Sequence, residues 1–202
     1  MTDPTPTRLD DAAFKTLLHE AIPHMRAFAR GLTQDATAAD DLAQDALLRA
    51  WDRRAQFRAN TNFKAWVMTI VRNQFYSDKR RSWRQVQLDD DHARETLPAA
   101  VDQDDVMALD DVRRALSELS EEHREALILV GAGGYAYQEA AEICGCAVGT
   151  MKSRVNRARA RLLEVLKAGP KIGRGDDGVS AVDALDSLLG DLEQMSACRS
   201  SG

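Results

Sequence analysis

The chain has little of several features that define common protein classes. Its 202 residues include only three cysteines, Cys144, Cys146 and Cys198. This odd, sparse set does not make a disulfide framework, and the Cys-x-Cys pair lacks the spacing of a zinc or redox motif. No segment approaches the roughly 18 consecutive apolar residues that suggest a transmembrane helix. Aromatic residues make up only 5% of the chain, which favours helix over sheet.

The usual sequence signs of an enzyme are also missing. There is no glycine-rich phosphate loop, nucleophile elbow or carboxylate pair with a pocket signature. The N-terminus carries Pro4 and Pro6 ahead of any apolar run and does not resemble a signal peptide. We expect a non-enzymatic protein of the reducing cytoplasm, with no catalytic residue, cofactor, metal site or membrane contact. The four histidines are scattered without metal-ligand spacing: His19, His24, His92 and His123.

Charge is segregated along the chain, although the net charge is only −5. Residues 61–84 hold six cationic side chains against one carboxylate, and residues 144–170 hold the same balance, so each segment carries +5. Between them, residues 85–111 hold nine carboxylates against one arginine, a net −8. Two basic blocks separated by an acidic one indicate two surfaces that face a polyanion. Composition by itself leaves open two ordinary solvated helix faces.

Apolar residues recur at helical spacing in the N-terminal part of the chain. Stripes of this kind run through residues 10–32 and 36–56, and a third begins near Phe63 and turns basic before Arg84. Pro23 interrupts the first stripe, so we expect a kink or a break there. These segments predict an all-α N-terminal domain over residues 10–84.

The rest of the chain predicts a second helical domain after a linker. Residues 85–104 are acid-rich, lack helical periodicity and contain Pro98, which indicates a flexible connection. Helical pattern resumes afterwards, with Ser120 as a candidate N-cap. The expected fold is therefore two small helical domains and a flexible acidic linker. The expected segments are 1–9 (disordered), 10–84 (first domain), 85–104 (linker), 105–168 (second domain) and 169–202 (mobile tail, with a short amphipathic helix as one option).

The second domain contains the pattern of a helix-turn-helix. A short helix over Tyr137–Ile143 is followed by a turn at Gly145 and a long basic helix over Val148–Lys167. On a helical wheel the long helix buries Met151, Val155, Ala158, Leu162 and Leu166.

The opposite face of this long helix is suited to DNA. Lysine and arginine donate to guanine and asparagine pairs with adenine, while flanking arginines hold phosphates. A solvated arginine-rich helix is the alternative, although no acidic residue lies between Thr150 and Leu163. The outward residues are Lys152, Ser153, Asn156, Arg157 and Ala160, and the flanking ones are Arg154, Arg159 and Arg161.

Three motifs together resemble a known family. The run GYAYQEAAEICGCAVGTMKSRVNRARARL resembles region 4 of extracytoplasmic-function (ECF) sigma factors. DDLAQDALLRAWDRRAQF is similar to their region 2.2, and FKAWVMTIVRNQFYSDKRR to their regions 2.3 and 2.4. The stretches NTNFKAW, REALILVGAGG and ICGCAVGT resemble the EcfG group, the general stress response sigma factors of alphaproteobacteria. The segment after Pro170 has no counterpart that we identify.

The resemblance implies a role for each motif. The region 2.2 helix would dock on the β′ clamp helices of core RNA polymerase through Asp40, Asp41, Gln44, Asp45 and Asp52. The next helix would bind the promoter −10 element, with a base extruded from the stack, through Lys64, Trp66, Arg72, Asn73, Tyr76, Lys79, Arg80 and Arg81. A core role is the competing interpretation for Trp66 and its neighbour Phe63. The −35 element would be read by Lys152, Ser153, Arg154, Asn156, Arg157, Arg159 and Arg161.

The same resemblance implies partners and leaves two alternatives. The expected partners are core RNA polymerase, through its β′ clamp helices and β flap, promoter DNA, and a small NepR-type anti-sigma protein. The free chain is expected to be monomeric. One alternative is a sigma mimic that only sequesters an anti-sigma protein, but mimics of this pathway carry a receiver domain for which no room remains. The other is a helix-turn-helix repressor, which leaves the N-terminal domain without a purpose.

Overall fold

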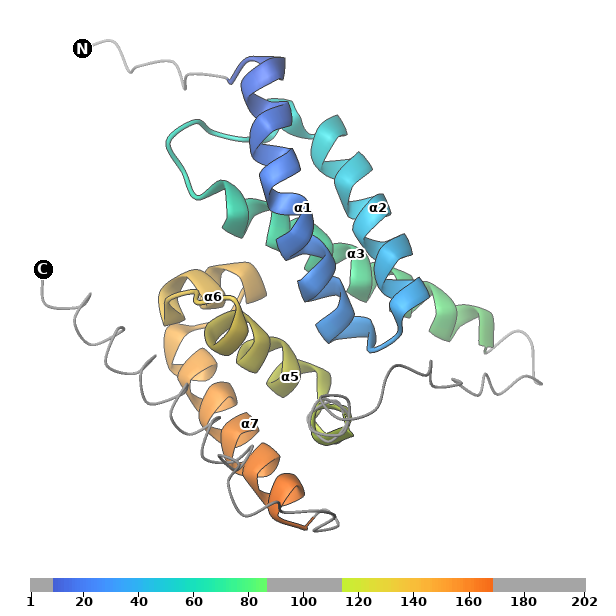
Figure 1. The fold of residues 1–202 in the computed structure, drawn as a ribbon, viewed down its shortest axis with the longest axis vertical. Helices are drawn as coiled ribbons and strands as arrows, with labels where there is room; N and C mark the ends of the chain where they lie inside the picture. Colours follow the sequence, from blue (N-terminus) through green and yellow to red (C-terminus); the bar gives the residue numbers. More distant parts are fainter. Residues whose placement is uncertain (1–8, 87–113, 169–202) are drawn as a thin grey trace, which may run out of the picture. The chain divides into compact units, whose positions relative to one another are not determined.

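The computed structural model describes residues 9–86 and 114–168, which fall into two compact units (Figure 1). Every regular element in these two ranges is helical, so the prediction of an all-α chain is confirmed. The expected N-terminal segment, the acidic linker from residue 87 onwards and the tail with its optional helix lie outside the described residues. The domain boundaries given above stay predictions.

The first unit begins with two capped helices. Helix α1 spans Asp11–Thr33, and the carboxylate of Asp10 accepts a hydrogen bond from the Ala13 N–H at 2.6 Å. Helix α2 spans Ala36–Asp52 and is capped in the same way by Asp35. Each cap satisfies a backbone donor that has no partner inside its helix.

Helix α1 continues through Pro23, so the break that its sequence suggested does not occur. Proline at this position removes one backbone hydrogen bond. Apolar residues on both sides of it, Ala21 and Met25, are each only 1% exposed. Packing of this buried face against α2 and α3 favours one continuous helix over a local break.

Helix α3, Phe63–Val86, completes the first unit and packs on both other helices. It begins where expected, with the Asn62 side chain accepting a hydrogen bond from the Ala65 N–H at 3.0 Å. A short 3₁₀ turn, η1 (Arg54–Gln56), follows α2 and leads into the connector that precedes α3. The connector places Phe57 among the rings of Phe14, Phe63 and Trp66, which meet mainly edge to face.

The second unit is a smaller helical assembly. A helical turn at residues 114–117 precedes α5 (Glu121–Leu127), which passes into a π-helical turn, η2 (Ile128–Ala132). Helices α6 (Tyr137–Cys144) and α7 (Val148–Ala168) follow. Ser120 stands at the N-cap position of α5, as predicted, but its side chain makes no capping hydrogen bond.

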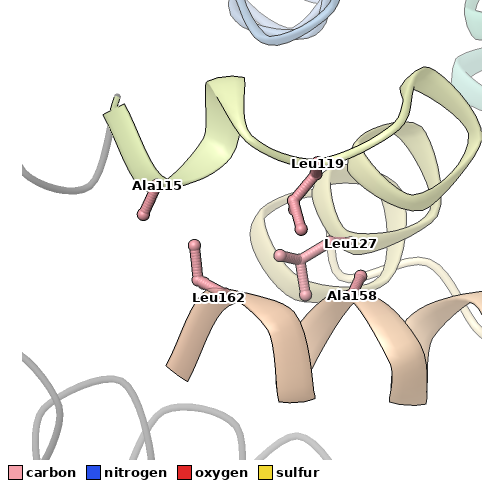
Figure 2. Packing of buried hydrophobic residues seen from close by; sticks show 5 residues of the cluster. All are labelled: Ala115, Leu119, Leu127, Ala158 and Leu162. Atoms are coloured by element: carbon pink, nitrogen blue, oxygen red, sulfur yellow. The ribbon is translucent and has the colours of Figure 1, made fainter. Parts of the chain in front are cut away.

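The core of the second unit lies between α7 and the segments before α6. Figure 2 shows Leu119 and Leu127 converging on Ala158 and Leu162 of α7, with Ala115 beside them. All five are at most 7% exposed. Burial of this apolar set fixes which face of α7 points inward, and therefore which face points to solvent.

The turn between α6 and α7 has the geometry of a helix-turn-helix. Gly145 adopts φ 64°, a left-handed conformation that glycine tolerates without steric cost. The Cys146 N–H donates to the Ala141 carbonyl at 3.0 Å and closes the end of α6. The predicted tight turn at Gly145 is therefore confirmed.

Candidate nucleic-acid interfaces

The inward face of α7 is the one that the helical wheel predicted. Met151, Val155, Ala158 and Leu162 are each at most 2% exposed, and Leu166 is half-buried. On the opposite face Lys152, Asn156, Arg157 and Ala160 are exposed, while Ser153 is half-buried. The structure therefore presents one face of cationic and amide donors, with a small Ala160 that leaves room for a close approach.

The flanking arginines of α7 are less open than the wheel suggested. Arg154 is only 18% exposed, and its guanidinium lies 2.7 Å from the carboxylate of Glu122 in the first turn of α5. Arg161 lies 3.7 Å from Glu118 and 3.3 Å from Glu164. Arg159 is half-buried. Two of the three expected phosphate contacts are thus ion-paired within their own unit. The partners Glu122 and Glu118 lie on other segments, so no local pattern indicated them, whereas Glu164 lies one turn from Arg161 on the same helix, at a spacing that favours pairing.

Helix α6 supports the start of α7. The ammonium of Lys152 lies 5.8 Å from the centroid of the Tyr137 ring, within reach of a cation–π interaction. Nearby, burial and, second, the charge of Glu139 raise the pKa of Tyr135 to about 12. Glu139 also accepts a hydrogen bond from the Ala136 N–H at 3.0 Å, which ties down the start of α6.

The second basic surface lies along the C-terminal half of α3. Asn73, Lys79, Arg80 and Arg81 are exposed there, and the Arg72 guanidinium stacks 4.7 Å from the centroid of the half-buried Tyr76 ring. An open hollow of about 340 Å³ follows, lined by Tyr76, Lys79, Arg80, Trp83 and Arg84.

Two of the predicted −10 residues stand apart from this surface. Lys64 lies in the first turn of α3, where its ammonium is 3.2 Å from the imidazole of His24. Trp66 packs its ring 5.4 Å from Phe57 and 5.9 Å from Phe63, centroid to centroid. Phe63 itself is 7% exposed. This packing favours the core interpretation of both aromatic residues.

The acidic residues of α2 share one exposed arc. Asp40, Asp41, Gln44, Asp45 and Asp52 are all exposed, and at 3.6 residues per turn they span less than half of the helix circumference. Asp40 lies 3.6 Å from Arg26, and Asp45 accepts a hydrogen bond from the buried amide of Gln74 at 3.5 Å.

Sequence reasoning missed two exposed apolar side chains beside these surfaces. Leu48 is 62% exposed at the centre of the acidic arc of α2, and Trp83 is 69% exposed at the end of the basic surface of α3. The sequence did contain a signal for their exposure. Both residues lie at helical spacing from the assigned polar residues, on a face where an apolar side chain has no core to join.

Other kinds of site find no support in the described ranges. No group of three His, Cys, Asp or Glu side chains within residues 9–86 and 114–168 is arranged to hold a metal ion. No helix in those ranges combines the length and the apolar character needed to cross a bilayer.

The chain matches family models in both units. Residues 17–85 match Sigma-70 region 2, and residues 109–162 match Sigma-70 region 4. The chain is 47% identical over 163 residues to the ECF RNA polymerase sigma factor EcfG of Rhodopseudomonas palustris strain TIE-1, covering 80% of this chain and 90% of that one. It is 33% identical to the ECF RNA polymerase sigma factor SigM of Mycobacterium tuberculosis, over 78% of this chain and 79% of that protein.

Two solved structures share the fold. The sigma factor RpoE of Bartonella quintana, in complex with the anti-sigma factor NepR, matches with a TM-score of 0.67 and 45% identity, over 78% of this chain and 99% of that one. CnrH, in complex with the cytosolic domain of CnrY, matches with a TM-score of 0.57 and 26% identity, over 80% and 92% of the two chains.

Proposed function

The chain belongs to the ECF RNA polymerase sigma factors of the sigma-70 family, and we propose that it directs transcription of general stress response genes through two separate promoter contacts. The observation that carries the proposal is the pair of exposed cationic helix surfaces, one on α3 and one on α7, in two compact units. A factor that grips two promoter elements needs one such surface for each. The family is not known for enzymatic activity, and the proposed place of action is the cytoplasm.

The second unit reads the −35 element in this proposal. The exposed face of α7 carries Lys152, Asn156 and Arg157, whose donors match base edges in a major groove. Ser153 adds a hydroxyl that suits either a base or a phosphate. Met151, Val155, Ala158 and Leu162 anchor the helix from behind, so that the reading face is held rigidly.

The first unit binds and opens the −10 element. Extruding a base from a duplex costs roughly a few kcal/mol, which contacts to the extruded base and its strand must offset. The exposed amide of Asn73, the ring of Tyr76 and the cations Lys79, Arg80 and Arg81 supply hydrogen bonding, stacking and phosphate neutralisation in one place.

Core RNA polymerase is bound through the acidic arc of α2. Carboxylates at Asp41, Asp45 and Asp52 suit a partner with basic side chains, such as the β′ clamp helices. The second unit would meet the β flap, and the segment around residues 85–104 would connect region 2 (residues 10–84) to region 4 (residues 105–168).

An anti-sigma protein of the NepR type is the proposed regulator. Support comes from the likeness to the Bartonella quintana RpoE, which is 45% identical and was solved in complex with NepR. The sigma-mimic alternative does not require an exposed cationic face on α7, whereas promoter binding does.

In vitro transcription tests the proposal. The full chain is combined with core RNA polymerase and a promoter library, with core polymerase alone as the control. We expect transcripts that depend on the chain and share two conserved elements upstream of the start site. If the chain binds core polymerase but yields no transcript above the control from any promoter, the initiation role is wrong and the mimic alternative gains support.

A further inference from the structure

We propose that Trp83 is an additional base-stacking residue, which holds an unpaired base of the opened promoter beyond the one at Tyr76. The inference deepens the proposed function and rests on it. Trp83 is the most exposed large apolar side chain among the described residues, with 69% of its surface open. It lies on α3, two turns beyond Tyr76, and both rings line the same open hollow of about 340 Å³.

The chemistry of this hollow selects its occupant. The other lining residues are Lys79, Arg80 and Arg84, so two aromatic rings and three cations share one helix face. The wall of the hollow is mainly apolar, which suits the face of a flat ring, while the cations at its rim suit a phosphate backbone. Aromatic platforms within a cationic groove are the combination that single-stranded nucleic acid requires. An apolar protein segment would gain nothing from the three cations.

The spacing of the two rings predicts which base is bound. Seven residues separate Tyr76 from Trp83, about 10 Å along a helix that rises 1.5 Å per residue. A stacked strand advances about 3.4 Å per nucleotide, and an unstacked strand advances further. The base on Trp83 should therefore lie roughly two to three nucleotides from the base that depends on Tyr76.

The test uses holoenzyme reconstituted from the full chain and core polymerase, on a promoter that it transcribes. Binding is measured to a template with a pre-opened bubble, for the wild type, Trp83→Ala and Trp83→Phe. Each unpaired nucleotide of either strand is replaced in turn by an abasic one. We expect Trp83→Ala to weaken bubble binding roughly 5- to 150-fold, the range that stacking of one base supplies, and Trp83→Phe to recover most of it.

The abasic scan separates stacking from other causes. At one position, an abasic nucleotide should strongly weaken bubble binding by the wild type but hardly change binding by Trp83→Ala. A different position should behave in this way for Tyr76→Ala. The two positions should lie two to three nucleotides apart. Equal binding of Trp83→Ala and the wild type, or no position that distinguishes them, overturns the inference while promoter-dependent transcription still stands. Weakened binding to core polymerase without DNA would place Trp83 against the polymerase and also overturn it. A wild-type chain that supports no transcription would remove the proposed function and this inference together.

Discussion

The guanidinium of Arg154 on α7 lies 2.7 Å from the carboxylate of Glu122 on α5, and only 18% of the arginine side chain is exposed. The pair joins the second turn of the proposed recognition helix to the first turn of the helix that packs on it. Glu122 there also stabilises the α5 N-terminus through the helix dipole. In this arrangement Arg154 positions α7, whereas the exposed Arg157 faces outward.

Arg154→Gln should therefore weaken −35 DNA binding without lowering its salt dependence, because the arginine acts through helix position. Arg157→Gln is the matched variant. If Arg157 contacts one phosphate, the substitution should reduce the slope of log affinity against log salt by about 0.9. If Arg157 reads a base, the substitution should relax base preference at one position by roughly 1–3 kcal/mol. Binding titrations of holoenzyme over a range of salt concentrations separate the two. A lowered slope for Arg154→Gln would show that the ion pair opens and that Arg154 holds a phosphate.

Glu122→Gln should destabilise the second unit by about 0.5–1 kcal/mol, since a partly exposed ion pair contributes little more than this. Hydrogen exchange of α5 and α7 measures the change locally. Glu118→Gln is the comparison, because Glu118 meets the half-exposed Arg161 at 3.7 Å and should matter less. Equal protection in both variants and the wild type would mean that the Arg154–Glu122 contact contributes no stability.

Leu48→Ala should weaken binding to core polymerase roughly tenfold or more. Leu48 is 62% exposed at the centre of the acidic arc of α2, and burying a leucine side chain against a partner contributes roughly 1.5–3 kcal/mol. The fold should not suffer, because the side chain is not part of the core. Leu48→Ala and Asp41→Asn are compared by competition binding without DNA. A variant that binds like the wild type would place the interface elsewhere on α2.

Gln74→Glu should destabilise the first unit by roughly 3 kcal/mol at neutral pH. The Gln74 side chain is 2% exposed and donates to Asp78 at 2.8 and 2.9 Å and to Asp45 at 3.5 Å. An introduced carboxyl there would be buried beside two carboxylates, so its folded-state pKa would rise above the ordinary value of about 4.3. Below the pKa that this carboxyl has in the unfolded chain, it is protonated and tolerated. The stability of the first unit is then lost as pH rises through the carboxyl's pKa in the folded state.

Urea unfolding at about pH 5 and about pH 8 measures this effect. Tryptophan fluorescence reports the first unit by itself, since Trp51, Trp66 and Trp83 all belong to it. Gln74→Met is the control, because it also removes the amide donor but adds no ionisable group. Its loss of stability should be smaller, and no part of that loss should come from ionisation at residue 74. A Gln74→Glu variant with the same loss at both pH values would contradict the like-charge argument.

Tyr135 should stay protonated to an unusually high pH. Its pKa is raised to about 12, mainly by burial, against an ordinary value of about 10. Its stabilising contribution is complete below about pH 10 and is lost as pH rises through 12. At pH 11 about one tenth of Tyr135 should be ionised, instead of about nine tenths for an ordinary tyrosine.

Ultraviolet titration of the wild type minus Tyr135→Phe isolates this phenol. Glu139→Gln should bring its pKa part of the way down, because the charge of Glu139 is the second cause of the shift. A difference curve with a midpoint near 10 would show that the Tyr135 side chain is solvated in solution.

The sequence by itself determined the helices, the faces they bury and the family. Periodicity placed Met151, Val155, Ala158 and Leu162 on one face of α7, and all four are buried, because a helix has a fixed angular step per residue. The start of α3 near Phe63 and the turn at Gly145 were also predicted from local sequence. Three motifs in the right order identified an ECF sigma factor, which the family matches bear out.

Only the tertiary structure decided which assigned side chains are open. Arg154 and Arg157 look alike in the sequence, but one is paired with Glu122 and the other is exposed. Pro23 signals a kink or a break, yet α1 is one continuous helix because the neighbours of Pro23 are buried on both sides. Trp66 and Trp83 lie on the same helix, but Trp66 is half-buried and packs against Phe57, whereas Trp83 is 69% exposed. Such outcomes depend on contacts between segments distant in sequence, which no local pattern records.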